Sequence, residues 1–76
     1  MITEEQFDTL VKMQFKEHNP QLGDTAVDDY MNSEEAKSEI ERGYRNFKKE
    51  FPKCDATPEQ LESRVAGIAF CLNLCY

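Results

Sequence analysis

Apolar side chains recur every three or four positions in three long stretches of the chain, a spacing that places them on one face of a helix. The first stretch has one polar interruption: its positions are Phe7, Leu10, Val11, Gln14 and Phe15. Thr3 and Gln6 have the spacing of a capping box, in which each side chain accepts a hydrogen bond from the backbone of the other residue. We expect this helix to end near His18, because Asn19-Pro20 disfavours its continuation.

The second stretch begins at Asn32 or Ser33 and ends at Phe51, where Pro52 stops a helix. Its apolar positions form one stripe at helical spacing: Ala36, Ile40, Tyr44, Phe47 and Phe51. With Asn32 as the N-cap, Glu35 would complete a capping box. Acidic residues gather in the first turns and basic residues in the last, as the helix dipole favours.

The third stretch opens with Thr57 as N-cap, Pro58 at the first helical position and Gln60 completing a second capping box. At 100° per residue, five of the following positions lie within about 40° of one line. These positions are Leu61, Val65, Ile68, Leu72 and Cys75. We expect this face to belong to the core.

A shorter acidic segment lies between the first two helices. Asp24 or Thr25 could cap one or two turns that present Val27, Tyr30 and Met31. No stretch shows the alternation of a strand. The sequence therefore predicts an all-α fold, a small antiparallel bundle of three long helices plus one short helix, with residues 1–76 as a single helical domain.

The last helix carries a second apolar face. Phe70 and Leu74 lie roughly opposite the Leu61–Leu72 line and are flanked by three small residues: Ser63, Ala66 and Gly67. In one interpretation the helix runs through the middle of the bundle and packs on both sides. In the other, Gly67, Phe70 and Leu74 form a docking or dimer surface, because so short a chain rarely has enough helices to cover both faces.

Charge is distributed unevenly over the 76 residues, whose formal net charge is −6. Residues 1–39 hold 10 acidic and 3 basic groups, whereas residues 65–76 hold none. The acidic first half argues against direct nucleic-acid binding, which needs clustered Lys and Arg. A basic cluster at 42–53 is interrupted by Glu50 and is typical of a solvated helix face.

The three cysteines and the one histidine make a weak metal signal. Cys71 and Cys75 are one helical turn apart, but Cys54 and His18 stand alone in the sequence, and structural zinc sites usually show two close ligand pairs. Buried thiols that behave as small apolar groups are the simpler interpretation. We therefore expect no metal and no cofactor.

Catalytic chemistry has little support, since no nucleophile is paired with a base. We predict that the protein is not an enzyme. Neither a signal peptide nor an apolar segment of about 20 residues is visible, so we expect no membrane span. An odd number of cysteines without an export signal favours a cytoplasmic location.

These observations favour a small acidic protein-binding module that acts as an inhibitor, adaptor or regulator of a partner with a basic surface. The candidate contact residues are acidic groups, two apolar anchors beside them and the second face of the last helix. They are Asp28, Asp29, Tyr30, Met31, Glu34, Glu35, Phe70 and Leu74. Tyr30 or Met31 is expected to be exposed, because aromatic and apolar anchors within polar rims dominate many interfaces.

Two alternatives remain open. One is a structural homodimer through the apolar last helix, and the other is an acidic mimic of nucleic acid, of the phage type, that occupies a host nucleic-acid-binding protein. In size, acidity and helix count the chain resembles the helical immunity proteins that block bacterial nuclease toxins, and also small phage inhibitors. The paired tyrosines of the immunity family are absent, because Tyr30 and Tyr44 are far apart.

Overall fold

The computed structural model describes residues 2–53 and 55–76, and these residues form four helices and no strand. The helices are α1 (Glu4–His18), α2 (Asp24–Met31), α3 (Glu34–Glu50) and α4 (Pro58–Cys75). The all-α prediction of three long helices and one short helix is therefore confirmed. None of these four helices combines the length and the apolar character needed to cross a bilayer.

Two of the three predicted capping boxes are present, those that begin at Thr3 and Thr57. At the start of α1, the Thr3 hydroxyl accepts a hydrogen bond from the Gln6 backbone N–H, and the Gln6 side chain accepts one from the Thr3 N–H. Thr57 and Gln60 make the same reciprocal pair at the start of α4. Each box satisfies two backbone donors that a helix N-terminus would otherwise leave without partners.

The predicted starts of the two middle helices need correction. The N-cap of α2 is Gly23, not Asp24 or Thr25, and no side chain caps it. Of the two predicted starts of α3, Ser33 is the N-cap and its hydroxyl accepts from the Ala36 N–H, whereas Asn32 is the C-cap of α2, so the alternative with Asn32 as N-cap is wrong. Both Asn and Ser are favoured caps, and the choice between neighbouring positions follows from where the preceding helix ends.

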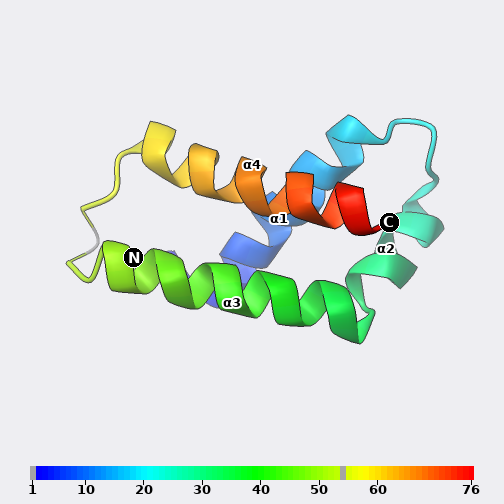
Figure 1. Ribbon diagram of the computed structural model, residues 1–76. Coiled ribbons are helices and arrows are strands. Elements are labelled where there is room, and N and C mark those ends of the chain that lie inside the picture. Colours follow the sequence, from blue (N-terminus) through cyan, green and yellow to red (C-terminus); the bar gives the residue numbers. More distant parts are fainter. Residues whose placement is uncertain (1, 54) are drawn as a thin grey trace.

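The two longest helices, α3 and α4, run side by side in opposite directions, and α1 crosses behind them (Figure 1). Two contacts between α3 and α4 agree with this antiparallel arrangement. Gly43 faces Ile68, whereas Glu50, farther along α3, pairs with Arg64, which is nearer the start of α4. The short α2 lies beside the C-terminal end of α4 (Figure 1). There the Tyr30 hydroxyl donates a hydrogen bond to the Leu72 carbonyl oxygen at 2.8 Å.

All four helices contribute to one hydrophobic cluster. Its buried members are Phe7, Val11, Phe15, Val27, Met31, Ala36, Ile40, Phe47, Val65, Ala69 and Leu72. The predicted stripes of α1 and α3 supply most of them. Complete burial of one large apolar side chain contributes about 1.5–3 kcal/mol, so this cluster is the main source of stability.

Removal of the α4 cap should weaken the fold measurably. We expect Thr57→Ala to lower the free energy of unfolding by about 1 kcal/mol, because a backbone donor loses its partner. Thr25→Ala is the matched control, since Thr25 lies exposed in the first turn of α2 and does not cap it. Urea denaturation followed by circular dichroism measures both. Equal losses in the two variants would contradict the assigned caps.

A second prediction concerns the close approach of α3 and α4 at Gly43. A Cβ atom there would lie 2.8 Å from Ile68 Cγ1 and closer still to Ile68 Cδ1, whereas a Cβ at Gly67 would meet no described atom within 4 Å. Overpacking costs about 1–3 kcal/mol, and replacing a helical glycine by alanine returns about 1 kcal/mol.

We therefore expect Gly43→Ala to be destabilising by about 1 kcal/mol and Gly67→Ala to be neutral or stabilising. Urea denaturation at low protein concentration measures both variants. A stabilised Gly43→Ala variant would show that the helices do not meet at this position.

Candidate interaction surface

The helix α4 is buried on one side only. Val65 and Leu72 lie in the core and α1 and α3 both contact this helix, whereas Phe70 is 58% exposed and Leu74 is 70% exposed. The interpretation that α4 runs through the middle of the bundle and packs on both sides is therefore wrong. Because α1 and α3 both contact the same side of α4, neither is placed to cover the opposite side.

Small residues accompany these two side chains. Between residues 63 and 74, six positions lie within about 70° of one line on the exposed side of α4 at 100° per residue, and none of them is charged. We call this set the outer face of α4: Ser63, Ala66, Gly67, Phe70, Cys71 and Leu74. At Gly67 no described heavy atom lies within 4 Å of an added Cβ, so the backbone is open to close approach there.

Charged pairs border the outer face on the α3 side. An open groove of about 490 Å³ between α3 and α4 is lined in part by Gly67 and Cys71. The Arg64 guanidinium donates to the Glu50 carboxylate at its rim, with Nε 3.0 Å from Oε2. An uncharged centre with a charged rim is the usual composition of a protein–protein contact.

A further exposed apolar residue lies on the α1 side. Met13 is 56% exposed and lines a second groove, of about 270 Å³, with Leu61 and Val65 of α4. The sequence contained a signal for it, because Met13 departs from the helical spacing of the buried α1 residues. It was not included among the candidate contact residues.

The acidic candidates lie on α2 and in the first turn of α3, and basic side chains neutralise some of that acidic surface. Lys12 pairs with Asp28 and Lys16 pairs with Asp24, although all four side chains are substantially exposed. The hydrogen bond from Lys16 lowers the pKa of Asp24, and the bond to Asp28 raises the pKa of Lys12. Surface pairs of this kind contribute little to stability.

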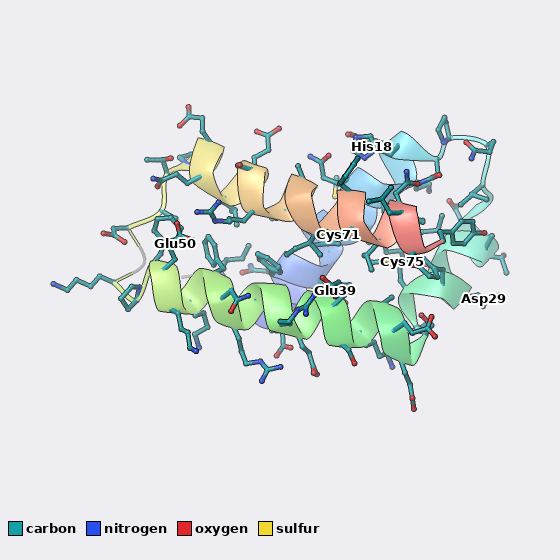
Figure 2. All side chains as sticks on the ribbon, viewed as in Figure 1. His18, Asp29, Glu39, Glu50, Cys71 and Cys75 are labelled. Atoms are coloured by element: carbon teal, nitrogen blue, oxygen red, sulfur yellow. The ribbon has the colours of Figure 1, made fainter. Side chains whose placement is uncertain are left out.

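The remaining acidic candidates, Asp29, Glu34 and Glu35, are exposed. Figure 2 shows Asp29 on α2, beyond the C-terminal end of α4. These three carboxylates are therefore positioned to meet a partner, but they belong to other helices than Phe70 and Leu74.

Met31 and Tyr30, the predicted apolar anchors beside the acidic groups, are not the exposed side chains that the prediction required. Met31 is only 7% exposed and belongs to the core, because Val27 and Met31, one turn apart, form the buried side of α2. Tyr30 is half-buried between Phe15 and Tyr76, with ring centroids 5.2 and 4.8 Å away. Tyr30 therefore ties α2 to α1 and to the end of α4.

The prediction of buried thiols is wrong for Cys71 and Cys75, which are free and exposed on successive turns of α4 (Figure 2). Cys71 lines the open groove between α3 and α4, and Cys75 is the last residue of α4, so the predicted core line of this helix does not extend to Cys75. Cys54 lies outside the described residues. Within residues 2–53 and 55–76, His, Cys, Asp and Glu side chains form no group of three that could hold a metal ion.

Comparison with known proteins gives no further guide to the site. No protein-family model, no curated protein and no solved structure matches this chain significantly.

The structural role of Tyr30 leads to a stability prediction. Tyr30→Phe removes the hydrogen bond to Leu72 and should cost about 1 kcal/mol, whereas Tyr76→Phe should cost little because Tyr76 is 57% exposed. Burial raises the pKa of Tyr30, so folding favours its neutral form. That contribution is present below pH about 10 and is lost as the pH rises through the folded pKa.

Chemical denaturation at pH 7 and in alkaline buffer measures this effect. The wild type should lose stability above pH 10 more steeply than Tyr30→Phe. Identical alkaline profiles for the two proteins would show that the Tyr30 hydroxyl is not held in this contact.

Proposed function

We propose that this protein is a non-catalytic protein-binding module that contacts its partner through the outer face of α4. In this role it serves as an inhibitor, adaptor or regulator of the bound protein. The observation that supports the proposal is the exposure of Phe70 and Leu74, at 58% and 70%, on a face that carries no charged residue between positions 63 and 74.

Exposure of two large apolar side chains on one helical face has a free-energy consequence. Each side chain would gain about 1.5–3 kcal/mol on complete burial, and their present exposure leaves over half of that gain to a partner. Small residues beside them leave room for a partner's backbone or side chains. Contiguous apolar surface with a polar rim is typical of interaction sites.

The acidic surface is a weaker basis for function. Lys16 pairs with Asp24, Lys12 with Asp28, and Arg42 with Glu39, the last at 2.6 Å. A mimic of nucleic acid presents carboxylates that are available to a basic cleft. The nucleic-acid mimic therefore has less support than a contact through α4.

The exposed thiols fit a reducing compartment, where free cysteines persist. A cytoplasmic setting is accordingly part of the proposal.

Affinity capture with matched variants tests the proposal. We expect Phe70→Ser combined with Leu74→Ser to abolish recovery of the specific partner, whether that partner is another protein or an untagged copy of this chain. Asp28→Lys combined with Asp29→Lys is the control on the acidic surface and should retain most of the recovery. Circular dichroism must show unchanged helix content in both.

The reverse pattern, with capture lost only on charge reversal, would transfer the binding site to the acidic surface. Capture that survives both double substitutions would overturn a role for either surface.

A further inference from the structure

The outer face of α4 has its small residues at one end and its large residues at the other. Ser63, Ala66 and Gly67 come first along the helix, and Phe70 and Leu74 follow. A partner that matches this shape must present large side chains opposite the first part and small ones opposite the second. The outer face of a second copy, running antiparallel to the first, places its large residues opposite the small ones and its small residues opposite the large ones.

An antiparallel pair of α4 helices related by a two-fold axis produces this match. With the axis between Gly67 and Phe70, Phe70 meets Gly67 of the second copy, and Leu74 meets Ser63 of the second copy. The Phe70 ring would lie over Gly67 of the second copy. Gly67 has no side chain there, and no described atom lies within 4 Å of an added Cβ. Parallel pairing would instead place Phe70 against Phe70 and leave the small residues apart.

Charge directs any contact between two copies to this face. Each chain carries a net charge of −6, so most contacts between two copies bring acidic groups together. Residues 65–76 carry no charged side chain. In the paired segments, residues 63–74, the one charged residue is Arg64, which would lie opposite Asn73 of the second copy and already pairs with Glu50.

We propose that the occupant of the outer face is a second copy of this chain, bound as an antiparallel two-fold pair of α4 helices. This inference rests on the proposed function, because it names the partner of the same surface. In a two-fold dimer the same patch of both chains forms the contact. A single face whose large and small halves complement each other can therefore form the whole interface.

Mass measurement by light scattering after size exclusion, over a range of concentrations, is the first test. The wild type should reach twice the mass of one chain as concentration rises, and Phe70→Ser should weaken the association at least about tenfold. Ser38→Ala, an exposed position on the side of α3 opposite Gly43 and therefore away from α4, is the control and should leave the association unchanged. A mass of one chain at every concentration, or a dimer unaffected by Phe70→Ser, would overturn the inference.

Gly67→Leu separates a specific pair from non-specific apolar contact. The substitution adds apolar surface, so non-specific association would become stronger. In the two-fold pair the leucine occupies the space of the Phe70 ring, and association should become weaker. Stronger association would overturn the proposed packing. Gly67 is exposed and an added Cβ meets no described atom within 4 Å in the isolated chain, so the helix content of the variant should be unchanged.

A disulfide measures the register directly. The proposed axis places Ser63 opposite Leu74 of the second copy, and both positions lie near the centre line of the outer face. In a chain with Cys54→Ser, Cys71→Ser and Cys75→Ser, Ser63→Cys combined with Leu74→Cys should give a covalent dimer on mild oxidation. The same chain with Ser63→Cys alone should give little, because the two Ser63 positions lie far out of register and disulfides need Cα atoms within about 7 Å. The opposite result would overturn this register.

Failure of the inference is distinguishable from failure of the proposed function. A monomeric chain whose capture of another protein still requires Phe70 and Leu74 would overturn the second copy as partner. It would leave α4 as the binding surface.

Discussion

The packing of α4 against α1 and α3 is the contact on which the rest of the structure depends. Val65 and Leu72 join the core residues of α1 and α3, and α2 is held to the end of α4 through Tyr30. A chain of 76 residues has few helices with which to build a core. Both long partners of α4 are used on the same side, and this leaves Phe70 and Leu74 in water.

The local features of this fold could be predicted from the sequence because they depend on residues within a few positions of one another. The capping boxes at Thr3 and Thr57 and the apolar stripe of α3 are examples. The start of α3 was ambiguous because Asn32 and Ser33 are both good caps. For the eight residues of α2, the helical spacing was too short to show that Met31, rather than Tyr30, faces the core fully.

Which side chains are exposed at the candidate contact surfaces depends on tertiary structure, and the sequence left two alternatives for α4. It showed that α4 has two apolar faces, but whether Phe70 is covered depends on where α1 and α3 lie. The exposure of Cys71 depends on the open groove between α3 and α4, and that of Cys75 on its place at the end of α4. The partial neutralisation of the acidic surface could not be foreseen either, because Lys12 and Asp28 come from different helices. Because of these tertiary effects, α4 is a better-supported contact surface than the acidic residues.

Site-specific photo-crosslinking tests the central claim, that α4 is the contact helix, most directly. A benzophenone amino acid replaces Phe70 in one chain and Glu41, an exposed residue of α3, in another. Both are expressed and irradiated in the native cell. We predict a discrete crosslinked species from position 70 and none from position 41. Crosslinks from position 41 alone, or equally from both positions, would contradict the assignment of α4 as the contact surface.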